Sequence, residues 1–141
     1  MVDQDKIRQK IHFIRVSLDK LERIREYSFE EFHTEPFVAD ACLRNMQIVI
    51  EALLDIGNHI IARQALGLPK TYGDVIHILV EHGVLEAERE EAYVRMARFR
   101  NRIVHLYDDV SMEEVYDILQ TKLEDVREFV TAIVRFAFSE Q

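Results

Sequence analysis

Residues that interrupt helices are scarce in this chain of 141 residues. It contains four glycines and two prolines, whereas 48% of its residues are hydrophobic. Glycine and proline concentrate in turns, so their scarcity argues against many short strands joined by tight turns. The composition therefore predicts long, uninterrupted helices. A chain of this length can bury a substantial core, and we expect one domain over residues 1–141, without a linker.

Cysteine is nearly absent. Because Cys42 has no second cysteine to pair with, the chain cannot form an internal disulfide, which suits a reducing cytosol. Nothing near Cys42 in the sequence completes a Cys-His metal site. We therefore interpret it as a buried packing residue rather than as a nucleophile or a metal ligand.

Long apolar runs are also missing. No stretch approaches the roughly 18 apolar residues that a membrane-spanning helix needs. The first five residues, MVDQD, lack the basic start of a signal peptide. We expect a soluble, cytoplasmic protein with no membrane partner.

Basic charge is in deficit, because the formal net charge is −8. A protein that coats nucleic acid is normally basic, so this charge argues against that class. Arginine nevertheless outnumbers lysine thirteen to five. Five arginines crowd one short stretch, namely Arg89, Arg95, Arg98, Arg100 and Arg102. This patch could bind phosphate locally, and the acidic remainder could equally recruit a basic protein partner.

Apolar residues recur at spacings of three and four over five stretches, which predicts helices near residues 5–26, 36–66, 72–80, 85–105 and 112–138. The second, the most apolar, should be the central rod. Ser28 and Ser111 each precede a glutamate by three residues, as in a capping box. Thr34 is the expected cap ahead of Pro36, and residues 72–74 should cap the third helix. The predicted fold class is all-α, an antiparallel up-and-down helical bundle of about four to five helices.

Four side chains with complementary chemistry lie within the eight residues from 100 to 107. Arg100 is a permanent cation that offers a planar fork to phosphate oxygens, and an imidazole such as that of His105 exchanges protons near neutral pH. Asn101 adds an amide and Tyr107 a phenol. Phosphodiester cleavage needs proton transfer and positive charge beside the transition state, which these groups supply without a metal. In the alternative interpretation, the arginines are solvated helix charges and His105 caps a helix.

The spacing Arg100-x-x-x-x-His105-x-Tyr107, with Asn101 directly after the arginine, resembles the motif of the HEPN superfamily. Within it the chain is most similar to the HepT-like toxins of bacterial and archaeal two-gene systems. A second matching segment runs from Arg44 to Gln47 and from residue 51 to 59, and is followed by Leu68 and Pro69. The resemblance covers essentially the whole chain.

This resemblance implies a metal-independent endoribonuclease toxin of a type VII-like pair, without a cofactor. The ribose 2′-OH would attack the adjacent phosphate, with His105 as acid or base, Arg100 stabilising the phosphate charge and Asn101 orienting the histidine or the phosphate. The other patch arginines, Arg95, Arg98 and Arg102, would bind RNA.

The resemblance also implies partners. The family motif lines a cleft between two subunits, so we expect a homodimer. An MntA-like nucleotidyltransferase antitoxin would adenylylate Tyr107 and so block the cleft. Alternatives remain: a non-catalytic helical module that binds a nucleotidyltransferase, or a structural bundle whose motif is accidental.

Helix geometry sets one constraint on this site. Residues five apart project about 140° apart around an ideal α-helix, so Arg100 and His105 cannot share a face. Either the helix loosens near Val104, or the two groups meet across a protein interface.

A polar notch interrupts the predicted central helix at Asp55, Asn58 and His59. With another carboxylate these side chains could be metal ligands, but no His-x-x-x-His or Glu-x-x-His pattern is present. The preferred interpretation is that Asp55 and Asn58 hydrogen-bond and orient Arg100, with no metal.

Overall fold

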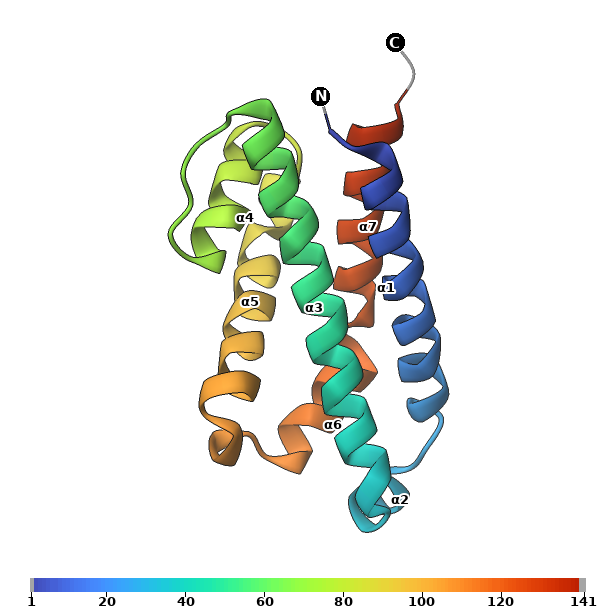
Figure 1. Cartoon of the computed structure of the whole chain (residues 1–141). Helices are drawn as coiled ribbons and strands as arrows, with labels where there is room; N and C mark the ends of the chain where they lie inside the picture. The colour runs from blue at the N-terminus through green and yellow to red at the C-terminus, as the bar shows by residue number, and fades with distance from the viewer. Residues whose placement is uncertain (1, 140–141) are drawn as a thin grey trace.

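Helices account for all the regular secondary structure in the part of the chain that the computed structural model describes, residues 2–139. They are α1 (Gln4–Ile24), α2 (Phe29–Thr34), α3 (Pro36–Gln64), α4 (Tyr72–Glu81), α5 (Glu90–His105), α6 (Met112–Thr121) and α7 (Leu123–Phe138), with 3₁₀ turns at Ala87–Arg89 and Tyr107–Asp109. Helices α1, α3, α5 and α7 alternate in direction, and α1 begins at the end of the bundle where α7 finishes (Figure 1). The predicted all-α up-and-down bundle is confirmed.

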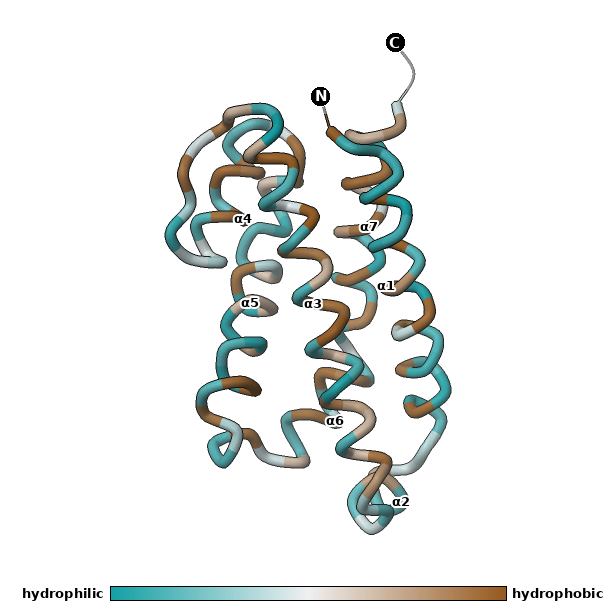
Figure 2. Tube along the Cα trace, in the orientation of Figure 1, coloured by the Kyte–Doolittle hydropathy of each residue, from teal (hydrophilic) through white to brown (hydrophobic). Residues whose placement is uncertain are grey.

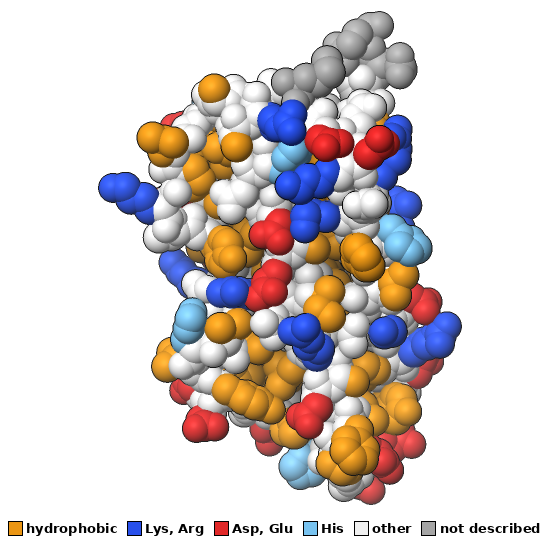
Figure 3. All heavy atoms as spheres, in the orientation of Figure 1, with side chains coloured by type: hydrophobic (Ala, Val, Ile, Leu, Met, Phe, Trp, Pro, Cys, Tyr) orange, Lys and Arg blue, Asp and Glu red, His pale blue; other side chains and the backbone are white. Residues whose placement is uncertain are grey.

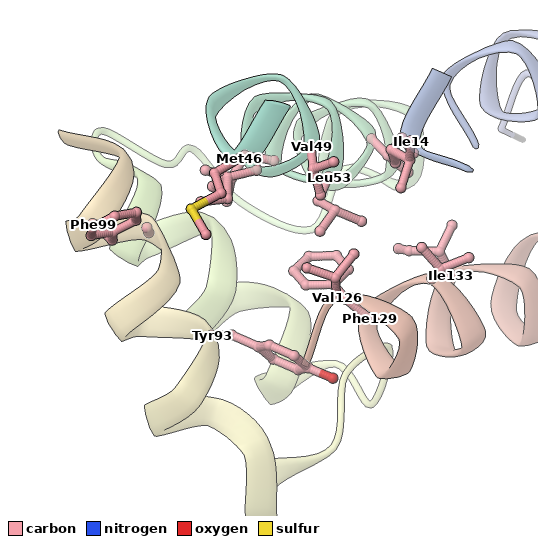
Figure 4. Close-up of a cluster of buried hydrophobic side chains, with 14 of the residues drawn as sticks. Ile14, Met46, Val49, Leu53, Tyr93, Phe99, Val126, Phe129 and Ile133 are labelled. Atoms are coloured by element: carbon pink, nitrogen blue, oxygen red, sulfur yellow. The ribbon is translucent and has the colours of Figure 1, made fainter. Parts of the chain in front are cut away.

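Helix α3 is the central rod, as its sequence predicted. It contacts each of the other six helices of residues 2–139. Hydrophobic residues recur along the length of α3 in the hydropathy colouring of Figure 2. In Figure 4, Met46, Val49 and Leu53 of α3 face the side chains of α5 and α7. Burying one such aliphatic side chain contributes about 1.5–3 kcal/mol, so the core formed on α3 supplies much of the folding free energy.

A glycine lets α4 approach α3 closely. A Cβ atom at Gly57 would lie 2.9 Å from side-chain atoms of both Val75 and Leu79. Helix α4 is capped by Thr71, whose hydroxyl accepts from the Asp74 backbone N–H at 3.0 Å while the Asp74 carboxylate accepts from the Thr71 N–H at 3.2 Å. The cap is therefore Thr71, one residue before the predicted residues 72–74. This cap and the close approach fix Tyr72, the first residue of α4.

Two of the other predicted helix starts differ from the structure. Ser28 forms the predicted capping box with Glu31. Thr34, however, does not cap α3, because its hydroxyl donates to the Glu30 carbonyl at 2.8 Å within α2. Glu35 takes the cap position without a side-chain bond. The helix predicted from residue 85 begins only at Glu90, because residues 84 and 85 are buried as a loop after α4.

The predicted final helix is broken into α6 and α7 at Lys122, whose backbone angles are φ −115° and ψ 1°. The bend lets α6 contact α2 while α7 runs against α1, and both still contact α3. The capping box predicted at Ser111 is only half formed. Its hydroxyl accepts from the Glu114 N–H at 3.1 Å, but the Glu114 carboxylate binds Arg102 instead.

Cys42 is fully buried in α3, which fits a packing role. Burial raises the pKa of its thiol to about 12, so it stays protonated at neutral pH. Over residues 2–139, no helix combines the length and the apolar character needed to cross a bilayer.

The hydroxyl of Tyr93 provides a test of the packing. The side chain is 1% exposed and its ring packs on Phe129 with centroids 4.9 Å apart, but the hydroxyl has no hydrogen-bond partner among the described residues. A buried hydroxyl without a partner costs free energy. We expect Tyr93→Phe to raise the free energy of unfolding by about 1 kcal/mol, measured by urea denaturation.

The matched control is Tyr116→Phe, which removes a hydroxyl that donates to the Tyr27 carbonyl at 2.7 Å. This variant should lose about 0.5–1 kcal/mol. A loss of stability in Tyr93→Phe comparable to that of the control would contradict the packing described for Tyr93.

Candidate functional site

The predicted motif occupies the last turns of α5 and the 3₁₀ turn after it. Helix α5 stays regular through His105, and the Leu106 N–H donates to the Arg102 carbonyl at 2.9 Å. The helix therefore does not loosen near Val104, and that alternative is wrong. Within one chain, Arg100 and His105 project about 140° apart around the axis of α5.

Arg100 is held by a carboxylate on α3. Its Nε and Nη2 atoms lie 2.9 and 2.8 Å from Oε2 of Glu51, and the side chain is 17% exposed. Gln47 donates to the same oxygen at 3.1 Å. The guanidinium carbon lies 5.0 Å from the ring centroid of Tyr72 on α4. Three helices thus fix the plane and position of this cation before any ligand arrives.

Asn101 links the arginine to the exposed face of α5. Its Oδ1 accepts from Nη1 of Arg100 at 3.2 Å. Asn101 and His105 are four residues apart, so they are neighbours on that face. Both are exposed. Asn101 therefore lies between Arg100, to which it is hydrogen-bonded, and His105, which it neighbours without a hydrogen bond.

His105 is exposed and makes no hydrogen bond or ion pair within residues 2–139. Its neighbours are apolar and also exposed: Val104 by 38%, Leu106 by 58% and Tyr107 by 52%. Hydrophobic side chains gather near this end of α5 on the face shown in Figure 3. Contiguous exposed apolar groups indicate an interaction surface.

Tyr107 lines a pocket of about 280 Å³ between α3 and the end of α5. Its hydroxyl donates to Oδ1 of Asp40 at 3.4 Å, which is a long hydrogen bond. Arg44 lines the same pocket and has no ion pair in the described part of the chain. Tyr107 is nevertheless 52% exposed, so solvent reaches much of its side chain.

The polar notch of α3 does not act as predicted. Asp55 lies one turn beyond Glu51 and pairs with Lys10 of α1 at 3.5 Å, and it makes no hydrogen bond or ion pair with Arg100. Nε2 of His59 accepts from the Asp3 N–H at 2.9 Å, and burial lowers the pKa of this histidine. Asn58 does lie near the site, in a pocket of about 320 Å³ that Tyr72 and Asn101 also line.

Glu51 is the residue that sequence reasoning missed. A signal for it is present in the sequence. Gln47 lies four residues before Glu51 and Asn58 seven residues after it, so the three polar residues share one face of an otherwise apolar helix. The described residues contain no group of three or more His, Cys, Asp or Glu side chains that could hold a metal ion.

The other arginines of the patch differ in their availability. Arg102 is bound by Glu114, with Nη2 and Oε1 2.9 Å apart, and by the Asp109 carbonyl at 3.1 Å. The hydrogen bonds that Arg102 donates to the Glu114 carboxylate hold the pKa of this guanidinium above its ordinary value. Arg95 pairs with Glu91 at 3.2 Å. Arg98 is exposed and has no ion pair within residues 2–139, so it is the patch arginine most available to a ligand.

Residues 14–133, which include this whole site, match the protein family described as ribonuclease HepT-like. The chain belongs to this family. Two curated HepT proteins are similar to it. The mRNA nuclease HepT of Shewanella oneidensis is 29% identical over 103 residues, which cover 73% of this chain and 77% of that protein. The tRNA nuclease HepT of Aphanizomenon flos-aquae is 24% identical over 127 residues, covering 90% and 86%.

A solved structure also resembles this HepT-like protein closely. The tri-AMPylated HEPN toxin of Shewanella oneidensis, solved in complex with an MNT antitoxin, superposes with a TM-score of 0.84 at 27% identity, covering 92% of this chain and 96% of that one. These relationships confirm the predicted family and identify the chain as an endoribonuclease.

Proposed function

We propose that this HepT-like endoribonuclease is the toxin of a toxin–antitoxin pair and cleaves RNA without a metal. The ribose 2′-OH attacks the adjacent phosphorus, and the bond to the 5′-oxygen breaks to leave a 2′,3′-cyclic phosphate. The observation that carries this proposal is the fixed guanidinium of Arg100, connected through Asn101 to the face that bears His105.

Arg100 stabilises the charge that develops on the phosphate. Glu51 and Asn101 engage part of its fork, and the remaining N–H groups are left to donate to phosphate oxygens. Because the carboxylate and the Tyr72 ring hold the fork in place, little reorganisation is needed as the reaction proceeds.

His105 transfers the protons. Its exposed imidazole is free to take a proton from the 2′-OH or to give one to the leaving oxygen. One imidazole cannot do both at once on opposite sides of the phosphorus. A homodimer that brings the exposed ends of two α5 helices together supplies two imidazoles and lets the Arg100 of one subunit face the His105 of the other. The exposed apolar residues Val104 and Leu106 support such an interface.

An MntA-like nucleotidyltransferase is the proposed antitoxin. It would transfer AMP to the exposed hydroxyl of Tyr107, two residues beyond His105. The added nucleotide brings bulk and negative charge to the cleft, which blocks RNA both sterically and by repulsion. The proposed site of action of this pair is the cytoplasm.

His105→Ala should lower RNA cleavage by about 10²- to 10⁴-fold, because the proton transfers lose their catalyst. The assay measures single-turnover cleavage of a short single-stranded RNA, with end-group analysis for a 2′,3′-cyclic phosphate. His82→Ala, which changes an exposed histidine at the end of α4, is the matched control and should cleave at the wild-type rate. A 2′-deoxy substitution at the cut position should protect that linkage.

Continued cleavage at the 2′-deoxy linkage would contradict the mechanism. Growth arrest by the toxin that persists in both His105→Ala and Arg100→Ala would favour the alternative, a non-catalytic module that binds a nucleotidyltransferase.

Tyr107→Phe should abolish AMP transfer, because it removes the accepting oxygen. The chain is co-expressed with its cognate nucleotidyltransferase, and intact-protein mass spectrometry counts the added AMP groups. Tyr27→Phe changes another exposed tyrosine, 38% exposed, and should leave the modification unchanged. Undiminished AMP addition to Tyr107→Phe would rule out Tyr107 as the acceptor.

A further inference from the structure

A third pocket, of about 390 Å³, lies between α5 and α6 on the side of α5 away from α4. Its floor is apolar and includes Met96, Phe99 and Ile118. Its rim carries charged side chains of both signs. A cavity of this kind suits a ligand with a flat apolar part and a charged part.

Most of the rim charges are already paired. Arg102 binds Glu114, and Asp125 binds Arg89. Three rim side chains, those of Arg98, Lys122 and Asp117, make no hydrogen bond or ion pair within residues 2–139. The pocket therefore offers two free cations and one free carboxylate above an apolar floor.

One nucleotide of a single-stranded RNA fits this combination. Its base would lie on the floor formed by Met96, Phe99 and Ile118, as unstacked bases do on apolar and aromatic side chains. Its phosphates would meet Arg98 and Lys122, and the carboxylate of Asp117 could accept a hydrogen bond from an N–H group of the base. A purely apolar or fatty ligand would leave Asp117 unpaired.

The pocket also lies beside the site of cleavage. Arg98, Asn101 and His105 follow one another at spacings of three and four on the exposed face of α5. Seven residues of helix place Arg98 about 10 Å along the axis from His105. A strand whose scissile phosphate lies at His105 can therefore reach the pocket with a neighbouring nucleotide.

We propose that this pocket is a nucleotide subsite that holds one base of the single-stranded RNA substrate outside the scissile linkage. The subsite rests on the proposed ribonuclease function and deepens it, because it explains how an acidic protein holds RNA through one local surface. Arg98 and Lys122 contact phosphate, and the floor contacts the base.

The test measures binding by fluorescence anisotropy at fixed salt, with His105→Ala protein so that the RNA stays intact. The probes are a labelled seven-nucleotide RNA and a dinucleotide that spans only a scissile linkage. Arg98→Ala and Lys122→Ala should each weaken binding of the longer RNA about three- to tenfold and flatten its salt dependence, while binding of the dinucleotide is unchanged. Lys20→Ala, on the exposed surface of α1, is the control and should change neither.

The base contact is tested by removing one base at a time from the longer RNA. In the His105→Ala protein, the parent of these variants, removal of the one base that occupies the pocket should weaken binding roughly tenfold. The same removal should have little effect when Ile118→Gln is added, because the floor of the pocket is then polar. Equal effects of the abasic positions in both proteins would overturn the subsite.

Two further results would also overturn it. The first is equal affinity for the longer RNA in Arg98→Ala, Lys122→Ala and the parent. The second is loss of nucleotidyltransferase binding in these variants with RNA binding intact, which would assign the pocket to the antitoxin. Cleavage of the dinucleotide by the wild type tests the ribonuclease function separately, because it does not involve the pocket.

Discussion

The ion pair between Arg100 and Glu51 is the interaction on which the candidate site depends. It joins α5 to the central helix α3, and both partners are half-buried, so water screens their attraction less than it would at the surface. The carboxylate of Glu51 reduces the net positive charge at the place where the proposed function needs phosphate to bind. Its benefit is orientation, because a lone arginine side chain samples many rotamers, whereas this one is fixed by a carboxylate, a neighbouring amide and the Tyr72 ring.

The sides of helix α5 carry residues with different roles. One side packs Tyr93, Phe99 and Ile103 into the core. The edge toward α3 and α4 holds Arg100. The exposed face carries His105, and the edge toward α6 carries Arg95, Arg98 and Arg102, of which Arg102 is hydrogen-bonded to Glu114 of α6. Under the proposed function, this one helix contributes to folding, catalysis and RNA binding, and the acidic character of the rest of the chain would confine RNA to it.

Periodicity in the sequence predicted the helices and the central position of α3, because those properties depend on local spacing of apolar residues. The motif from Arg100 to Tyr107 predicted the family. The partner of Arg100 could not be predicted in this way, since Glu51 lies 49 residues away and meets it only through helix packing. The prediction that Asp55 orients Arg100 was wrong, because Asp55 lies one turn of α3 beyond Glu51 and its carboxylate pairs with Lys10 of α1. The break at Lys122 has no glycine or proline to mark it, and it arises from the competing contacts of α6 and α7.

The most direct measurement is single-turnover RNA cleavage by Glu51→Gln, with Asp55→Asn as a matched carboxylate change four residues along α3. Removing the negative charge at Glu51 should leave RNA binding unchanged or tighter, yet the cleavage rate should fall by roughly 10²-fold, because the guanidinium loses its orientation. Asp55→Asn should cleave at the wild-type rate. An unchanged or faster cleavage rate in a folded Glu51→Gln protein would contradict the role given to the ion pair between Arg100 and Glu51.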